Sequence, residues 1–247
     1  FMRDQPAHRY FLMNQKYSHG EQVAEYFKKS IAVEKPDAEI VGEDYAALGQ
    51  VKDYAPYVAK IKASGADAIV TGSWGQDFTL LVKALNDAGL SLPIYAYYAQ
   101  MAGTPTALAQ GRMVEVYQIA YGHPNYDGRL GELIAGFKQR FDDDLYLYAF
   151  YNALVALGHA MDQAGSIDPV QVAATLEDMR FEGFNGESYF RKQDHQLQQG
   201  LWISQWQPVS DRYGYGVENT AYTFAPLHYI PLEQASTPST CDMKRPG

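Results

Sequence analysis

The chain has 247 residues, a formal net charge of −9 and no block of basic residues. This charge disfavours binding to nucleic acid, because phosphates attract clustered lysine and arginine side chains. No uninterrupted apolar run approaches the roughly 20 residues that a membrane-spanning helix needs. With 47% hydrophobic residues, the chain can form one large globular domain or two lobes with buried cores.

The first part of the chain alternates between short apolar runs and helical patterns. Strand-like segments recur about every 28 residues, which is the length of a βα unit. We expect strands at 8–14, 39–43, 68–71 and 92–98, and helices at 21–34, 53–64 and 78–87. Strands that alternate with helices imply right-handed crossovers, so the expected fold class is α/β with a parallel sheet and flanking helices.

The second part of the chain is richer in helices. We expect a strand at 113–121, helices at 130–141, 146–164 and 168–179, a hairpin at 181–190 and a strand at 201–206. The pair Asn185-Gly186 is the turn signal of the hairpin. Beyond Gln207 the chain is rich in Gly, Pro, Tyr and Ser, and we expect it to wrap over a surface.

The sequence contains no recognisable motif for catalysis or for binding a metal or cofactor. There is no G-x-S-x-G elbow, P-loop or H-E-x-x-H pattern, and the single Cys241 excludes an internal disulfide. The triplet 142–144 (DDD) is interpreted as a charged loop and not as a cation site. The histidines lack ligand spacing and are interpreted as surface or helix-cap residues; they are His8, His19, His123, His159, His195 and His228.

Three loops that follow predicted strands carry aromatic, amide and hydroxyl groups. Because parallel strands end at the same edge, these loops are expected to converge there and to bind a small, partly apolar molecule. The candidate ligand-binding residues are Tyr17, Ser18, Trp74, Gln76, Asp77, Tyr97, Tyr98 and Gln100. Two alternatives stay open: the aromatic residues pack against another lobe, and Asp77 caps the helix that follows it.

Several segments, taken in order, resemble the periplasmic binding proteins of the branched-chain amino acid (Leu/Ile/Val) ABC transporter family. They are 14–20 (NQKYSHG), 54–68 (YAPYVAKIKASGADA), 72–77 (GSWGQD), 95–98 (YAYY), 164–169 (AGSIDP), 184–186 (FNG) and 240–246 (TCDMKRP). The resemblance covers nearly the whole chain. It implies a type I periplasmic binding fold, in which two lobes close on a ligand around three crossover segments.

The resemblance also implies how the chain is divided. Residues 9–117 and 200–247 would form the second, carboxyl-terminal lobe, and residues 118–199 the returning part of the first lobe. The amino-terminal part of the first lobe would be missing, because Phe1 to Asp4 read as the last turn of a helix. Cys241 would then have its partner, if any, in that missing part.

Carried over by position, Tyr17 matches a tyrosine of the ligand cleft and Trp74 an aromatic wall. Tyr98 falls near the position where amino acid binders place an acidic residue against the ligand ammonium. A buried ammonium without a carboxylate partner is costly. The resemblance therefore leaves an amino acid, an aliphatic or aromatic carboxylate, and an amide as ligand classes.

These observations predict a binding protein without catalytic activity, metal or cofactor. The predicted role is to capture a small molecule outside the cytoplasm and deliver it to the membrane permease of an ABC importer. The resemblance implies a periplasmic location, or an extracellular, lipid-anchored one in a Gram-positive host. A ligand sensor that feeds a receptor or regulator is the alternative, and an α/β enzyme is a further one.

Overall fold

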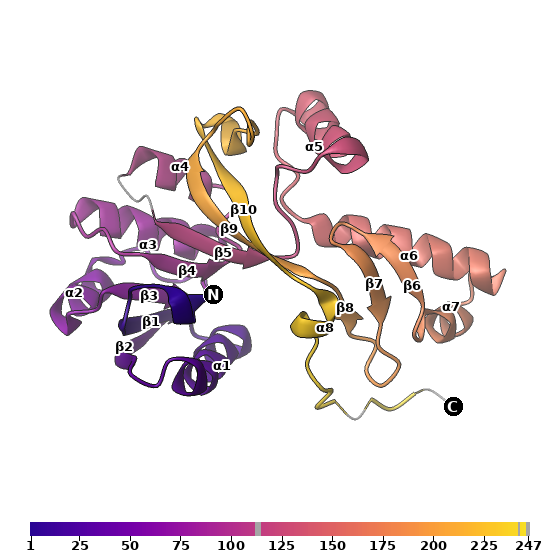
Figure 1. Cartoon of the computed structure of the whole chain (residues 1–247), viewed down its shortest axis with the longest axis horizontal. Coiled ribbons are helices and arrows are strands. Elements are labelled where there is room, and N and C mark those ends of the chain that lie inside the picture. Colours follow the sequence, from indigo (N-terminus) through magenta and orange to yellow (C-terminus); the bar gives the residue numbers. More distant parts are fainter. Residues whose placement is uncertain (112–114, 242, 246–247) are drawn as a thin grey trace. The chain divides into compact units, whose positions relative to one another are not determined.

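The computed structural model describes residues 1–111, 115–241 and 243–245. The chain forms two compact units (Figure 1). Unit 1 comprises Phe1–Ile119 and Ser204–Ala225, and unit 2 comprises Ala120–Ile203 and Pro226–Gly247. The sequence analysis assigned residues 200–247 to the second lobe as one segment. In the structure this segment is divided, and its part from Pro226 onward belongs to unit 2. Which unit corresponds to which lobe stays a prediction.

Unit 1 is built on a parallel sheet, as the strand–helix alternation predicted. Strand β1 pairs in parallel with β2 and β3, β3 with β4, and β4 with β5. The strands are β1 (Arg9–Gln15), β2 (Glu39–Ala46), β3 (Ala68–Thr71), β4 (Ile94–Tyr97) and β5 (Val116–Ala120). Two later strands, β9 (Leu201–Pro208) and β10 (Tyr222–Ile230), complete the order β10-β9-β5-β4-β3-β1-β2.

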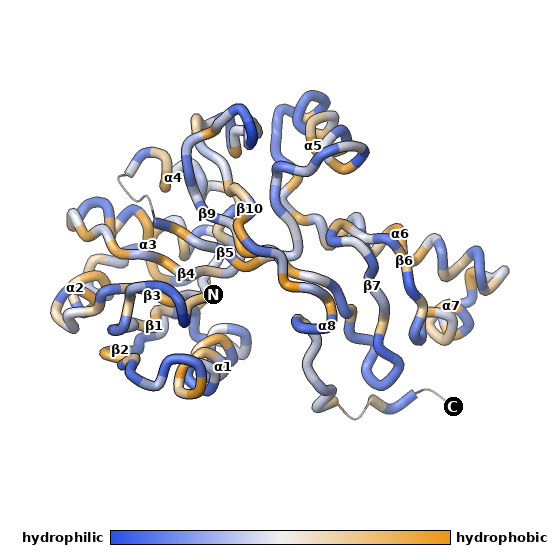
Figure 2. The backbone as a smooth tube through the Cα atoms, viewed as in Figure 1, coloured by the Kyte–Doolittle hydropathy of each residue, from blue (hydrophilic) through white to orange (hydrophobic). Residues whose placement is uncertain are grey.

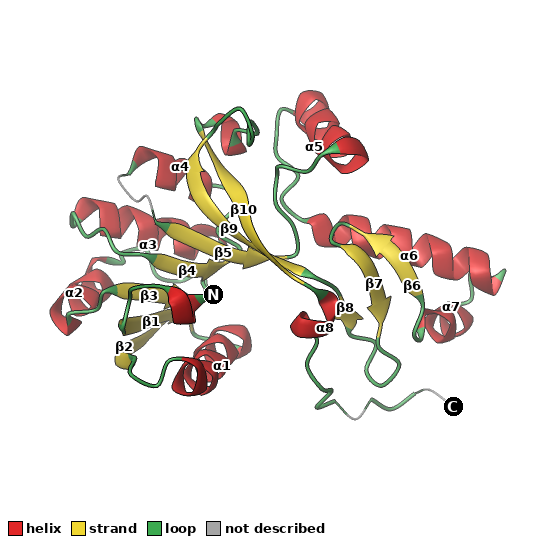
Figure 3. Ribbon diagram, in the orientation of Figure 1, coloured by secondary structure: helices red, strands yellow, loops and turns green. Residues whose placement is uncertain are grey.

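Helices cover both faces of the sheet in unit 1 (Figure 3). They are α1 (Ser18–Glu34), α2 (Ala55–Ser64), α3 (Gly75–Asp87) and α4 (Thr104–Gln110). Side chains alternate across a strand, so Phe11 and Met13 of β1 join the core under α2, α3 and α4. Tyr10 and Leu12 join the opposite core, under α1. Hydrophobic and hydrophilic segments alternate along α2 and α3, as amphipathic helices require (Figure 2).

The strand order creates a switch point between β1 and β3. The chain winds from β1 outward to β2, and then returns to the other side of β1 and continues from β3 to β5. In open α/β sheets, ligands bind outside the carboxyl ends of the strands at such a reversal. The residues that follow β1 and β3 are therefore the ones to inspect for function.

Within the described residues, and apart from a short helix near its carboxyl end, unit 2 contains three helices and a small sheet. The helices are α5 (Gly128–Phe141), α6 (Tyr148–Ala164) and α7 (Pro169–Leu176), and the antiparallel strands are β6 (Arg180–Gly183), β7 (Gly186–Phe190) and β8 (Leu197–Gln198). Phe184 and Asn185 form the hairpin turn and Gly186 has a φ of 81°, so the predicted hairpin is confirmed. Within the described residues, no helix is long and apolar enough to cross a membrane.

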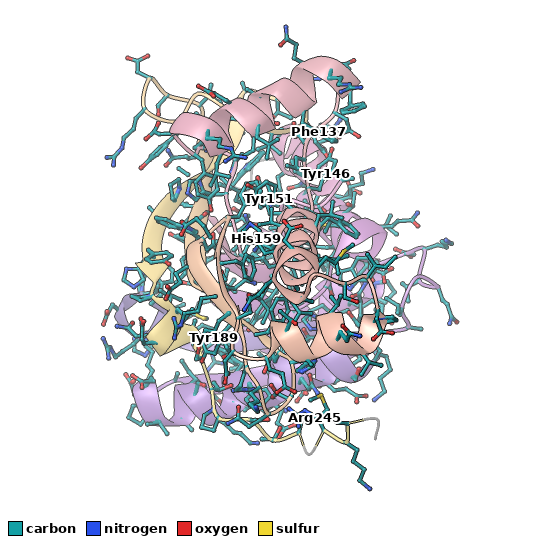
Figure 4. The ribbon with its side chains drawn as sticks, turned by 90° about the vertical axis from the view of Figure 1, so that its right-hand side faces the viewer. Phe137, Tyr146, Tyr151, His159, Tyr189 and Arg245 are labelled. Atoms are coloured by element: carbon teal, nitrogen blue, oxygen red, sulfur yellow. The ribbon has the colours of Figure 1, made fainter. Side chains whose placement is uncertain are left out.

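Polar contacts hold the carboxyl-terminal segment to the rest of unit 2. The Arg245 side chain, labelled in Figure 4, pairs with Glu177 and donates to the backbone carbonyl of Lys192. Arg191 pairs with Asp194, which also accepts a hydrogen bond from the Ser239 hydroxyl. The segment includes the short helix α8 (Leu232–Ala235).

The structure differs from the sequence prediction at several elements. The stretch beyond Gln207 contains the nine-residue strand β10, whereas only a surface wrap was expected. Helix α4 was not predicted, and α7 ends at Leu176 instead of Met179. The predicted strand at 113–121 is β5, Val116–Ala120, and residues 112–114 lie outside the described residues. At the start of the chain, Met2–Asp4 form a short 3-10 helix, and Phe1 precedes it.

Candidate functional site

Four of the predicted site residues belong to one network of aromatic side chains in unit 1. Tyr17 precedes α1 and Trp74 precedes α3, and the Trp74 Nε1 donates a hydrogen bond of 2.7 Å to the Tyr17 hydroxyl. Tyr97 ends β4, and its ring centroid lies 6.5 Å from that of Tyr98. The ends of β1, β3 and β4 thus meet at one edge, as the parallel sheet requires.

His19 joins these aromatic residues into a single cluster. Its ring centroid lies 5.8 Å from that of Tyr17, 5.9 Å from Tyr97 and 6.0 Å from Tyr98. Interpreting His19 as a surface or cap residue was wrong, because the half-buried imidazole lies among three tyrosines. Its position two residues after Tyr17, in the same predicted loop, was the available signal. We call Tyr17, His19, Trp74, Tyr97 and Tyr98 the aromatic cluster.

Burial controls the protonation of the cluster. It lowers the pKa of His19, an effect that the backbone of Gly72 opposes, so the imidazole is favoured in its neutral form. Burial also raises the pKa of Tyr97 and Tyr98 above the ordinary tyrosine value, so both phenols stay protonated well beyond neutral pH. The cluster therefore presents uncharged hydrogen-bonding groups.

Tyr98 has an unusual backbone conformation. Its φ is 51°, in the left-handed region that residues other than glycine rarely adopt. Such a conformation costs roughly 1–3 kcal/mol and is found preferentially at functional sites. This backbone conformation sets the direction in which the Tyr98 side chain projects from the end of β4.

Asp77 is buried and binds other parts of unit 1. The side chain is 3% exposed, and its Oδ2 accepts hydrogen bonds of 2.8 Å from both the Gln15 side chain and the Gly49 backbone. The Gln15 amide also donates to the Trp74 carbonyl at 3.2 Å. The structure shows no side-chain cap on α3, so the capping alternative for Asp77 was wrong. Asp77 instead ties the ends of β1 and β3 together.

The three remaining predicted site residues have different environments. Gln100 is 7% exposed, and it pairs with Gln118 through two hydrogen bonds of 3.0 Å. Ser18 and Gln76 are exposed in the first turns of α1 and α3. Ser18 and Gln76 are therefore accessible, whereas the Gln100 side chain is committed to its neighbour.

Several buried polar atoms near the ends of β1 and β3 lack a hydrogen-bond partner. They are the Asn14 Nδ2, the Gln15 Oε1 and the Ser73 Oγ. A buried polar atom left unpaired costs about 1–3 kcal/mol, and folded proteins contain few of them. The protein encloses these atoms, so they do not face a ligand in this conformation.

Unit 2 contains a separate polar and aromatic cluster. His123 stacks on Tyr126 at 4.0 Å and lies edge-on to Trp202 at 4.8 Å. The Tyr126 hydroxyl donates to the Asn185 Oδ1 at 2.8 Å, and the Tyr229 hydroxyl donates to the Asn185 carbonyl at 2.7 Å. The two hydroxyl groups thus hold the hairpin turn in place through Asn185. His123 is 3% exposed, so its interpretation as a surface residue was wrong.

The described part of the chain contains no group of three or more His, Cys, Asp or Glu side chains that could hold a metal ion. A doubly wound parallel sheet with accessible aromatic side chains at its switch point is the architecture of small-molecule-binding α/β proteins.

Comparison with known proteins identifies the family. The model of the periplasmic binding protein family matches residues 1–212, and the chain belongs to this family. It is similar to the Leu/Ile/Val-binding protein homolog 4 of Brucella melitensis, with 26% identity over 97% of this chain. The alignment covers 58% of that relative, so the chain spans a little over half the length of the relatives that it matches.

Solved structures show the same fold. A Brucella ovis protein described as binding leucine, isoleucine, valine, threonine and alanine, in its closed conformation, matches with a TM-score of 0.81 and 24% identity, over 99% of this chain and 64% of that chain. A solute-binding protein of an ABC transporter from Rhodopseudomonas palustris, in complex with p-hydroxybenzoic acid, matches with a TM-score of 0.74 and 17% identity, over 92% and 61%. The type I periplasmic binding fold predicted from the sequence is confirmed.

The buried contacts of Asp77 generate a prediction about stability. Asp77→Ala should lower the free energy of unfolding by about 1–3 kcal/mol, because the Gln15 amide and the Gly49 amide lose their acceptor. Urea-induced unfolding would measure the change. Asp87→Ala, at the exposed end of the same helix, is the matched control and should stay within about 0.5 kcal/mol of the wild type. Equal stability of the two variants would contradict the role given to Asp77.

His123 generates a prediction about pH. Burial lowers its pKa to about 4, and its Nδ1 accepts a hydrogen bond from the Asn125 backbone. Between pH 6.5 and 4 the unfolded chain binds a proton that the folded chain does not, so stability falls as the pH falls. This histidine contributes up to about 3 kcal/mol to that fall, since one pKa unit corresponds to about 1.4 kcal/mol.

His123→Phe keeps an aromatic ring and removes the titration, so it should flatten the pH dependence of the melting temperature over this range. The control is His159→Phe, at an exposed histidine on α6 that is labelled in Figure 4. If His123→Phe has the same pH profile as the wild type, His123 is not a source of the acid sensitivity.

Proposed function

We propose that the protein is an extracytoplasmic solute-binding component of an ABC importer. Membership of the periplasmic binding protein family supports this role, and the similar proteins are solute-binding proteins and not enzymes. The protein would capture a small molecule and pass it to a membrane permease. The periplasm is the proposed location, with a lipid-anchored position on the cell surface as the equivalent in a Gram-positive host.

The observation that carries the proposal is the aromatic cluster at the switch point of unit 1. Trp74 is 38% exposed although it is a large aromatic side chain, and its Nε1 is bonded to Tyr17. Partly exposed aromatic rings beside a few hydrogen-bonding groups are the composition of small-molecule sites. The proposed ligand contacts are Tyr17, Ser18, Trp74, Gln76, Tyr97 and Tyr98.

Asp77 and Gln100 have a supporting role in this proposal. The Asp77 carboxylate accepts from Gln15 and Gly49, and Gln100 pairs with Gln118. A ligand that displaced either contact would leave a buried group unpaired, at a cost of about 1–3 kcal/mol. We therefore assign these two residues to positioning the loops and not to touching the ligand.

The proposed ligand is an amino acid, an aliphatic or aromatic carboxylate, or an amide. Two of these ligand classes occur among proteins with the same fold. The Brucella ovis protein is described as an amino acid binder, and the Rhodopseudomonas palustris protein is in complex with p-hydroxybenzoic acid. Binding would close the protein around the ligand by favouring the closed state, in proportion to the difference in affinity between the two states.

Calorimetry on the full-length protein tests the proposed contacts. A panel of amino acids, aromatic acids, aliphatic acids and amides should contain a binder. Trp74→Ala and Tyr98→Ala should each weaken its binding by roughly 1–3 kcal/mol, as expected for central aromatic contacts. The matched control is Tyr26→Ala, because Tyr26 lies on α1 and is 58% exposed.

Two results would count against the proposal. If the folded protein binds nothing in the panel, the transport role is wrong as stated. If a ligand binds to both cluster variants with the affinity of the Tyr26→Ala control, the aromatic cluster is not the binding surface.

A further inference from the structure

The imidazole of His19 is enclosed by the tyrosines of the aromatic cluster. The rings of Tyr17, Tyr97 and Tyr98 all lie within 6.0 Å of it, measured between ring centroids. A cation held by tyrosines would need their faces for itself. Here a side chain of the protein already occupies that position, so the cluster is not an open cage for a cation.

The two nitrogens of His19 have different surroundings. The Nε2 is buried beside Gly72, where a Cβ built on that glycine would lie only 3.3 Å away from it. The absence of a side chain at residue 72 thus lets the ring lie against the end of β3. Because Nε2 is enclosed, Nδ1 is the nitrogen left to meet a ligand. On a neutral imidazole with a proton on Nε2, Nδ1 is a hydrogen-bond acceptor.

The carboxylates that reach this edge are bonded within unit 1, including Glu218, which accepts hydrogen bonds from the backbone amides of Gly103 and Thr106. Asp77 is the one acidic residue in the segments 16–20, 72–77 and 98–103, and its Oδ2 already accepts two hydrogen bonds within unit 1. Glu21, in the first turn of α1, pairs with Lys16 at 3.2 Å. An ammonium placed against these segments would lose its hydration without gaining a counter-charge, which is costly.

Flat, partly exposed rings instead suit a planar group of the ligand. Trp74 and Tyr17 are fixed relative to each other by their hydrogen bond, so they offer aromatic surface at little entropic cost. A ring that stacks there can direct a hydroxyl group at the acceptor nitrogen of His19. The protonated phenols of Tyr97 and Tyr98 line the same region.

We propose that His19 is a specificity-determining residue. It accepts a hydrogen bond from the ring hydroxyl group of a carboxylate ligand that carries a planar ring and no ammonium group. This inference rests on the proposed function and narrows its ligand to hydroxyaryl carboxylates. A site built to bond a hydroxyl rejects the analogue without it, because the acceptor is then buried unpaired. A ligand with an ammonium group binds more weakly, because no free carboxylate among the described residues at this edge pairs with its charge.

Matched ligand pairs test the inference by calorimetry on the full-length protein. The first pair is 3-(4-hydroxyphenyl)propanoate and 3-phenylpropanoate, which differ by the hydroxyl. The second pair is 3-(4-hydroxyphenyl)propanoate and tyrosine, which differ by the ammonium. The hydroxylated acid without an amine should bind at least about tenfold more tightly than either of its partners. Choline, a quaternary ammonium, should not bind.

Variants of His19 connect the preference to this residue. His19→Phe keeps a ring among the tyrosines but has no acceptor, so the preference for the hydroxyl should fall to about twofold or less. His19→Asn places an oxygen near the position of Nδ1 and should retain part of the preference. The control is His159→Phe, at an exposed histidine of unit 2, and it should keep the full preference. Circular dichroism and melting temperatures would establish that each variant is folded.

The outcomes separate this inference from the proposed function. Tighter binding of tyrosine or choline than of the hydroxylated acid overturns the inference, and so does a hydroxyl preference that persists in His19→Phe. In both cases a small molecule still binds, so the proposed function stands. If neither these compounds nor any other amino acid, acid or amide binds, the proposed function and the inference both fail.

Discussion

The buried carboxylate of Asp77 is the interaction on which the functional edge of unit 1 depends. Strands β1 and β3 lie side by side, yet their ends lead into different helices and need to be held in register. Asp77 accepts from the side chain of Gln15, at the end of β1, and from the backbone of Gly49, which follows β2. Gln15 in turn donates to the Trp74 carbonyl. One carboxylate therefore links the loops after three neighbouring strands.

The aromatic cluster depends on that link. Trp74 stands between β3 and α3, and its bond to Tyr17 requires the loops after β1 and β3 to keep a constant separation. His19 then fills the space between Tyr17 and the tyrosines after β4. A rigid arrangement of this kind loses little entropy when a ligand binds. The sheet, the buried hydrogen bonds and the aromatic cluster thus form one continuous support for recognition.

Local patterns in the sequence predicted most of unit 1 for physical reasons that the structure makes plain. Strands β1 and β3 are buried on both faces and read as apolar runs, while Gly65 has the positive φ of 66° expected where α2 ends. Strand β10 was missed because the stretch beyond Gln207 is rich in Gly, Pro, Tyr and Ser, and the strand itself contains Pro226. It lies at the edge of the sheet, where a missing backbone N–H is tolerated.

The site was harder to predict because its contacts join distant segments. The partners of Asp77 lie 62 and 28 residues away along the chain, so nothing local distinguishes it from a ligand contact or a helix cap. His19 has no metal-ligand spacing, and its surroundings follow only from rings that the ends of two strands, β1 and β4, bring together. Parallel topology predicted that the loops meet, but not which side chains each loop turns inward.

Hydrogen exchange on the full-length protein, with and without a bound ligand, tests most directly whether this edge is the ligand-binding surface. The account predicts that the ligand slows exchange of the backbone amides in segments 16–20, 72–77 and 97–100, which carry the aromatic cluster. Unchanged exchange in all three segments, with protection elsewhere in the protein, would contradict it.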